Sequence, residues 1–166
     1  MFLFLLVCFI VLSQITVLPE LFGLGLGVNL FLSFVLACSM HRSGREAITV
    51  AFLGGMFLAV YSNLNFGYLP LFYVLVAYLS SLVTGDVFKN SFFLALMGFV
   101  WVMLFEILVA FSLLSSGHII NMPLYSLRVV FGSALINSGL VLVFTVLVRA
   151  YSDYLFRDQT TSSLRS

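Results

Sequence analysis

Long apolar segments follow one another along nearly the whole chain, and only short polar connectors separate them. A helix that crosses a bilayer needs about 20 mostly apolar residues, with a range of roughly 17–25. Six segments meet or approach this length: Phe2–Leu18, Leu21–Met40, Ala47–Ser62, Gly67–Thr84, Phe92–Leu114 and Leu124–Ala150. Composition agrees, because 63% of the residues are hydrophobic and 8% are charged, whereas a soluble domain needs more polar surface. We therefore predict an all-α polytopic membrane protein with six transmembrane helices in residues 1–154 and a short, disordered polar tail at 155–166.

The basic residues predict how these spans are oriented. With six spans the connectors alternate between two sides, and six of the seven basic residues fall on the side that holds both termini. Cytoplasmic loops are enriched in Lys and Arg, so this asymmetry predicts that both termini are cytoplasmic. The N-terminal run lacks the positive region and cleavage site of a signal peptide, and we expect it to stay as the first span. Pro19 is expected to separate that span from the second in a tight hairpin.

Glu106 is the one carboxylate deep inside a predicted span. A charge there costs at least about 2.5–3.5 kcal/mol on insertion scales, so it usually faces the bundle interior and has a partner. At 1.5 Å per residue, Glu106 lies about 12 Å from the outer end of its helix, and Arg128 lies about 6 Å from the outer end of the next. The sequence predicts a Glu106–Arg128 ion pair, which would set helix register, bind a partner protein or take part in transport. An Arg128 that reaches the interface independently of Glu106 is the alternative.

Small residues recur in the predicted spans, and they favour close contacts between helices in lipid. Gly23 and Gly27 are four residues apart, Gly54 and Gly55 lie in the third span, and Gly132 begins the run GSALINSG in the last span. Asn137 lies within that run and can form a hydrogen bond between helices. Packing within the chain and contact with another membrane protein both remain open for these positions.

The sequence contains no pattern that indicates catalysis or cofactor binding. Cys8 and Cys38 lack metal-ligand spacing, and His41 and His118 fall in connectors on opposite sides of the predicted membrane. The glycine-rich GLGLG lies in an apolar run and is not a phosphate-binding loop. The net charge of +1 gives no reason to expect nucleic-acid binding. We expect a non-enzymatic protein without a metal or cofactor, which acts through contacts with other molecules in the bilayer.

The middle third of the chain resembles the MreD family of rod shape-determining proteins. A basic turn with glycine, HRSGREA, leads into the apolar helix AFLGGMFLAV, and a polar turn, YSNLNFG, leads into PLFYVLVAYLSSL. The chain is also similar to this family in length, number of spans and scarcity of charge. Members of the family often carry an Asp four residues after a glycine in the third helix, whereas counting from Gly55 reaches Ala59 here.

This resemblance implies a component of the bacterial elongation machinery, or elongasome, in the inner membrane. Such a protein would bind the membrane-anchored MreC and support peptidoglycan synthesis by RodA and its penicillin-binding partner, with the actin-like MreB on the cytoplasmic side. It would be a scaffold that positions its partners and determines cell shape.

The same resemblance implies an alternative, because the family is said to share a six-helix fold with energy-coupling-factor transporter subunits that bind vitamins. Such a subunit would place a polar, aromatic pocket near the outer face. Asn63, Asn65, His118 and Asn121 fall at that level, together with Glu106 and Arg128. The single Trp, Trp101, lies in the middle of a span, where we expect it to pack against other helices.

Overall fold

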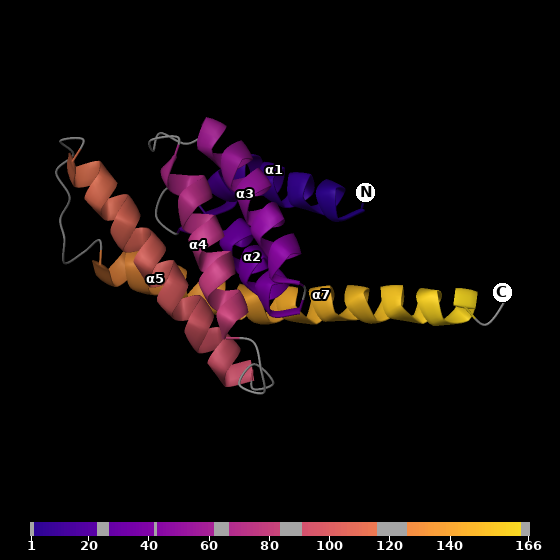
Figure 1. Cartoon of the computed structure of the whole chain (residues 1–166). Helices are drawn as coiled ribbons and strands as arrows, with labels where there is room; N and C mark the ends of the chain where they lie inside the picture. The colour runs from indigo at the N-terminus through magenta and orange to yellow at the C-terminus, as the bar shows by residue number, and fades with distance from the viewer. Residues whose placement is uncertain are drawn as a thin grey trace.

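The computed structural model describes residues 2–22, 27–41, 43–61, 67–83, 91–115 and 126–163, and its elements in these ranges are all helical. In chain order they are α1 (Phe2–Phe22), α2 (Leu30–His41), α3 (Gly44–Tyr61), α4 (Tyr68–Leu82), α5 (Ser91–Ser115), η3 (Ser126–Phe131) and α7 (Gly132–Ser163). η3 is a π-helical turn that leads directly into α7, so the described part of the chain forms six helical rods (Figure 1).

Within the described ranges, length and apolar character identify three helical segments that can cross a membrane: Gly44–Tyr61, Phe92–Ser115 and Val129–Ser152. The shorter apolar segments are Leu5–Val17, Leu30–His41 and Tyr68–Leu82. The predicted all-helical membrane class is confirmed to this extent. Six complete spans with both termini in the cytoplasm stay a prediction.

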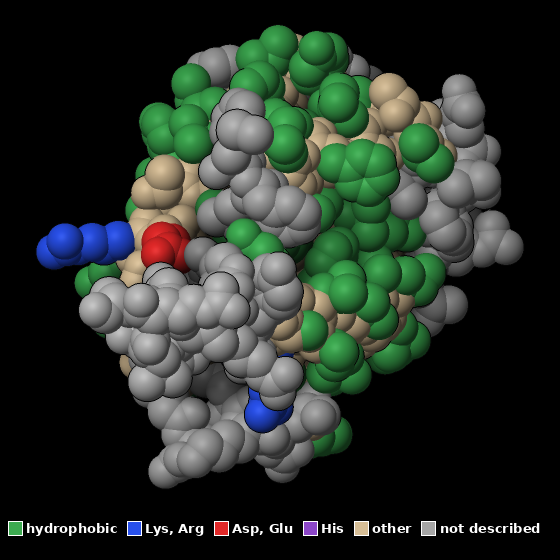
Figure 2. All heavy atoms as spheres, turned by 90° about the vertical axis from the view of Figure 1, so that its right-hand side faces the viewer, with side chains coloured by type: hydrophobic (Ala, Val, Ile, Leu, Met, Phe, Trp, Pro, Cys, Tyr) green, Lys and Arg blue, Asp and Glu red, His purple; other side chains and the backbone are tan. Residues whose placement is uncertain are grey.

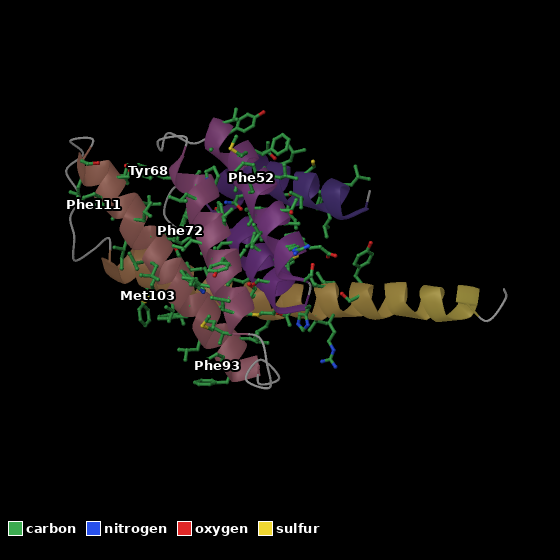
Figure 3. All side chains as sticks on the ribbon, viewed as in Figure 1. Phe52, Tyr68, Phe72, Phe93, Met103 and Phe111 are labelled. Atoms are coloured by element: carbon green, nitrogen blue, oxygen red, sulfur yellow. The ribbon has the colours of Figure 1, made fainter. Side chains whose placement is uncertain are left out.

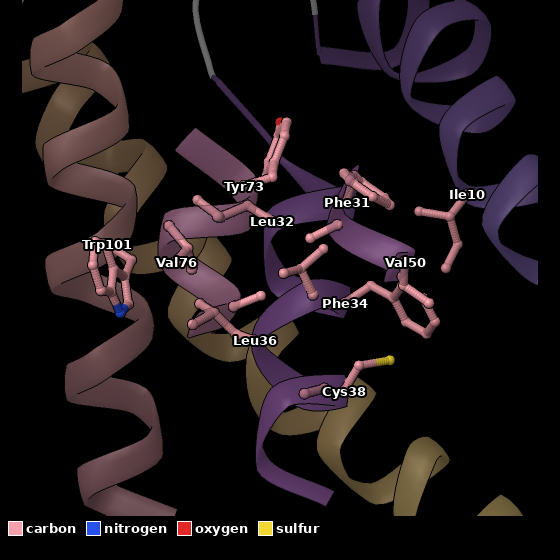
Figure 4. Packing of buried hydrophobic residues seen from close by; sticks show 14 of the residues in the cluster. Ile10, Phe31, Leu32, Phe34, Leu36, Cys38, Val50, Tyr73, Val76 and Trp101 are labelled. Atoms are coloured by element: carbon pink, nitrogen blue, oxygen red, sulfur yellow. The ribbon is translucent and has the colours of Figure 1, made fainter. Parts of the chain in front are cut away.

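Helix α2 lies at the centre of the bundle. Every residue from Phe31 to Ser39 is buried, and α2 contacts α1, α3, α4, α5 and α7. A helix that is apolar all round needs such surroundings. Phe31 meets Tyr73 of α4 edge to face with ring centroids 4.9 Å apart (Figure 4), and Phe34 meets Phe144 of α7 with ring centroids 5.7 Å apart. Such aromatic pairs stabilise the contacts beyond the area that they bury.

The boundary between the first two helices differs from the prediction. α1 continues through Pro19 to Phe22, and α2 begins only at Leu30, nine residues after the predicted start. Proline is tolerated in the first turn of a helix but removes a backbone hydrogen bond further along, so α1 continues here against the local preference of Pro19. Gly27 lies outside any helix just before α2, and a glycine costs about 1 kcal/mol within a helix, which favours the later start of α2.

The C-terminal end also differs from the prediction. α7 continues to Ser163, whereas the sequence predicted a span ending at Ala150 and a disordered tail from residue 155. The chain contains no Gly or Pro after Gly139. Because adding residues to an existing helix is far easier than starting one, the polar segment can extend α7.

The outer surface of the bundle is strongly apolar. Exposed side chains on α5 recur every three or four residues, which places them on one face of the helix: Phe92, Leu96, Val100, Leu104, Ile107 and Phe111. Phe52 on α3 and Phe111 on α5 are labelled in Figure 3, and both are exposed. Hydrophobic side chains dominate the described part of the face in Figure 2, with few charged side chains among them. This surface suits a lipid environment.

Candidate functional site: a buried polar cluster at the α1–α2 break

Polar groups from four helices and the α1–α2 break meet in the apolar interior. We call them the polar cluster, and its members are Gln14 of α1, Gly27 and Asn29 of the break, Ser33 of α2, Tyr73 of α4, and Ser133 and Asn137 of α7. Asn29 is 3% exposed, and the side chains of Ser33, Ser133 and Asn137 are completely buried. Buried polar groups are costly unless they are hydrogen-bonded, so the bonds within the cluster determine whether this interior is stable.

Asn137 of α7 binds the non-helical backbone of the break. Its side-chain oxygen accepts a hydrogen bond from the Asn29 N–H at 2.8 Å. Its side-chain nitrogen donates to the carbonyl oxygens of Gly27 at 3.0 Å and Ser133 at 2.7 Å. Irregular backbone at membrane depth is tolerated only where protein or water satisfies it. Asn137 therefore replaces bonds that a continuous helix would have formed.

Asn29 begins α2 and joins that helix to its neighbours. Its side-chain oxygen accepts from the Leu32 N–H at 2.9 Å, three residues ahead, which is the geometry of a helix N-cap. Its side-chain nitrogen donates to the Tyr73 hydroxyl at 3.1 Å. Gln14 of α1 donates to the Asn29 oxygen at 3.2 Å and accepts from the Phe31 N–H at 2.8 Å. A single asparagine thus links α1, α2 and α4.

Glu106 of α5 lies beside the break. Its side chain is 4% exposed, and its carboxyl carbon lies 3.0 Å from the position that a Cβ atom on Gly27 would occupy. The Ser133 oxygen is also 3.0 Å from that position, and it accepts a hydrogen bond from the Gly27 N–H at 2.9 Å. A side chain at residue 27 would force the Glu106 carboxyl group or the Ser133 hydroxyl to shift, so glycine favours this close approach of backbone and carboxyl group.

The predicted small-residue positions have different surroundings. Gly27 lies outside any helix and binds Ser133 and Asn137, so it does not belong to the predicted helical glycine pair with Gly23, a residue outside the described ranges. A Cβ atom on Gly54 would overlap the Phe31 ring, and one on Gly55 would lie 2.8 Å from the Pro70 Cα atom. Both therefore permit close packing of α3 within the chain.

The remaining predicted residues are less completely described. Gly132 is partly exposed at the start of α7. Arg128 lies in η3, and its side chain is outside the described residues, so the Glu106–Arg128 pair stays a prediction. The outer residues Asn63, Asn65, His118 and Asn121 also lie outside the described ranges.

The sequence pattern indicated Asn137 but not four other members of the polar cluster, Gln14, Asn29, Ser33 and Tyr73. One signal was available, since Gln14 and Asn29 are amides in otherwise apolar runs, and such residues usually bond between helices. These residues come together only because the chain is not helical just before α2, and the sequence predicted one continuous span there.

Trp101 packs in the interior, as expected, with the centroid of its ring 6.3 Å from that of Phe72.

The cluster has the chemistry of a structural connection. Amide and hydroxyl groups bind the backbone and one another, and they come from segments as far apart as residues 14 and 137. Within the ranges that the structure describes, no three His, Cys, Asp or Glu residues are grouped so that they could hold a metal ion. The arrangement supports a fixed relative position of α1, α2, α4 and α7. Comparison of the chain with protein-family models, with curated proteins and with solved structures gave no match.

Proposed function

We propose that this protein is a non-enzymatic scaffold of the bacterial inner membrane that binds other membrane proteins. The observation that carries the proposal is the polar cluster, in which Asn29 and Asn137 use their side chains on groups of the same chain. Such a network holds helices in place without a diffusible ligand. What the bundle then presents to the membrane is an apolar surface of fixed shape.

The specific proposal is a scaffold of cell elongation, in which the chain binds an MreC-like partner and supports the peptidoglycan synthase pair of RodA and its penicillin-binding partner. The resemblance in HRSGREA, AFLGGMFLAV and PLFYVLVAYLSSL to the MreD family supports it. Gly54 and Gly55, which belong to this resemblance, pack closely against Phe31 and Pro70 of the same chain. These two glycines therefore contribute to packing within the bundle. The exposed face of α5 is available for contact with lipid or with a partner helix.

A detergent pull-down tests the scaffold function. The full chain is co-expressed with the tagged MreC-like protein of the same bacterium, and in a parallel culture with an unrelated tagged protein that has a single transmembrane helix. We expect severalfold enrichment of the chain with the MreC-like protein over the unrelated one. Equal recovery with both proteins would contradict the proposal.

The same preparation separates the scaffold from a vitamin-binding subunit. In a scaffold, a panel of vitamins leaves the unfolding temperature of the purified protein unchanged. A binding subunit would be stabilised, because a ligand at 100 times its Kd contributes about 2.7 kcal/mol to folding. A large, saturable rise in unfolding temperature with one vitamin would therefore favour the transporter function.

A further inference from the structure

A groove of about 280 Å³ runs between α1 and α3, away from the polar cluster. Val7 of α1 and Val50 of α3 are 4% and 6% exposed and form its buried part. Leu53 and Phe57 of α3 are 41% and 45% exposed and lie along its open part. The groove is thus apolar along most of its length and open to the surroundings of the bundle.

The residues of α3 that line the groove define its length. Glu46, Val50, Leu53 and Phe57 recur at intervals of three or four, so they share one face of the helix. At 1.5 Å per residue, the distance from Glu46 to Phe57 is about 17 Å. The hydrocarbon core of a bilayer is about 30 Å thick, so the groove is as long as one leaflet is deep. A second helix, about 10 Å across, is too wide for a groove of this volume.

Among the described residues that line the groove, charged groups are found at only one end. Arg45 and Glu46 lie there, at the start of α3, and both are exposed. Thr49 follows one turn later, and its hydroxyl donates to the Arg45 carbonyl oxygen at 2.9 Å. Because this bond uses the Thr49 donor, polar recognition is concentrated at Arg45 and Glu46.

This distribution of charge matches a zwitterionic lipid. A guanidinium group binds phosphate oxygens through paired charge-assisted hydrogen bonds. A neighbouring carboxylate attracts an ammonium group and repels a second anion. The predicted orientation places this end of α3 at the cytoplasmic surface, where lipid headgroups begin.

We propose that the α1–α3 groove binds a phosphatidylethanolamine molecule. One acyl chain lies along Val50, Leu53 and Phe57, the phosphate binds Arg45, and the ammonium lies beside Glu46. This site is independent of the scaffold function, since it rests on the groove, its charged end and the predicted orientation of α3.

Native mass spectrometry of the full chain tests the site. The protein is released from nanodiscs that contain equal amounts of phosphatidylethanolamine and phosphatidylglycerol, and the retained lipid is identified. We expect the released protein to retain one phosphatidylethanolamine molecule more often than phosphatidylglycerol. Arg45→Gln should retain this lipid about tenfold more weakly, because it loses a charge-assisted contact. Arg149→Gln, which removes an exposed cation of α7 outside the groove, should retain lipid like the unmodified chain.

Two further variants separate the headgroup from the acyl chain. Glu46→Gln should reduce the preference for phosphatidylethanolamine over phosphatidylglycerol severalfold. Leu53→Trp should fill the groove and displace the lipid, whereas Leu71→Trp, at an exposed position of α4, should not. Equal retention of both lipids by the unmodified chain would overturn the proposal, and so would retention that is the same in Arg45→Gln and Arg149→Gln.

Discussion

Among single residues, Asn137 forms the largest number of side-chain hydrogen bonds to backbone groups of the polar cluster. It accepts from Asn29 and donates to the carbonyl oxygens of Gly27 and Ser133, so one side chain satisfies three backbone groups. Buried groups that lose such a partner cost about 1–3 kcal/mol each. Substitution of Asn137 should therefore lower the stability of the protein more than substitution of neighbouring polar residues.

We expect Asn137→Ala to lower the free energy of unfolding by about 1–3 kcal/mol. Ser138→Ala is the matched control, since the Ser138 hydroxyl bonds only locally to the Leu135 carbonyl at 2.7 Å. Steric trapping in bicelles measures both. A loss in Asn137→Ala no greater than that in Ser138→Ala would mean that the cluster contributes nothing to stability.

Gly27 allows a second prediction at this scale. Gly27→Ala should be destabilising, because its Cβ atom would collide with the Glu106 carboxyl group and press on the Ser133 hydroxyl. Overpacking of this kind typically costs about 1–3 kcal/mol.

Gly139→Ala provides a control of opposite sign. A Cβ atom there meets nothing within 4 Å, and alanine gains up to about 1 kcal/mol over glycine within a helix. Thermal unfolding in detergent should show a lower midpoint for Gly27→Ala and an equal or higher one for Gly139→Ala. The same direction for both variants would contradict the close approach of Glu106.

At the scale of helices, the crossing of α3 and α4 depends on Gly55. A Cβ atom on this residue would lie 2.8 Å from the Pro70 Cα atom and 3.2 Å from the Tyr73 ring. The nearest of these atoms is backbone and cannot rotate away, so α3 and α4 would have to separate. Small residues commonly permit such contacts between helices in membranes.

We expect Gly55→Ala to destabilise the protein by about 1–3 kcal/mol, as overpacked interiors do. Gly44→Ala in the same helix should be nearly neutral, because its Cβ atom would meet the rotatable Ser81 side chain at 3.2 Å. The fraction folded after heating in detergent, followed by size-exclusion chromatography, compares the two variants. If both were equally stable, the α3–α4 contact would have to be looser than the structure indicates.

Hydropathy predicts the bounds of some helices better than those of others. Apolar length predicted α3, α4 and α5 to within a few residues of their observed bounds, because each is one uninterrupted run. It failed at the start of α2, where the same apolar run contains a break. Hydropathy does not distinguish a helix from buried irregular backbone whose hydrogen bonds come from other helices. Gln14 and Asn29 supplied the clue, but only their packing shows what they bind.

At the scale of the whole molecule, the distribution of basic residues predicts that both termini face the cytoplasm. Six spans, an even number, would place the C-terminus on the same side as the N-terminus. A green fluorescent protein fused after Ser166 should therefore fluoresce, and alkaline phosphatase fused there should be inactive. Phosphatase fused in the predicted outer connector, at Asn65, should be active. An active phosphatase at the C-terminus would place that end outside the cytoplasm. If the N-terminus is cytoplasmic, the number of spans would then be odd, which contradicts the prediction.

Composition and hydropathy are sufficient to predict an apolar, all-helical membrane protein, because the surroundings must suit the side chains and lipid requires that the backbone satisfy its own hydrogen bonds. They do not predict that α2 begins late, that it lies at the centre, or that Asn29, Asn137 and Gly27 meet close to Glu106, since these features depend on packing between helices. Residues that bond across more than 100 positions leave no periodic pattern in the chain. Their partners are selected by packing, since each buried polar group must find whichever donor or acceptor the folded bundle brings within reach.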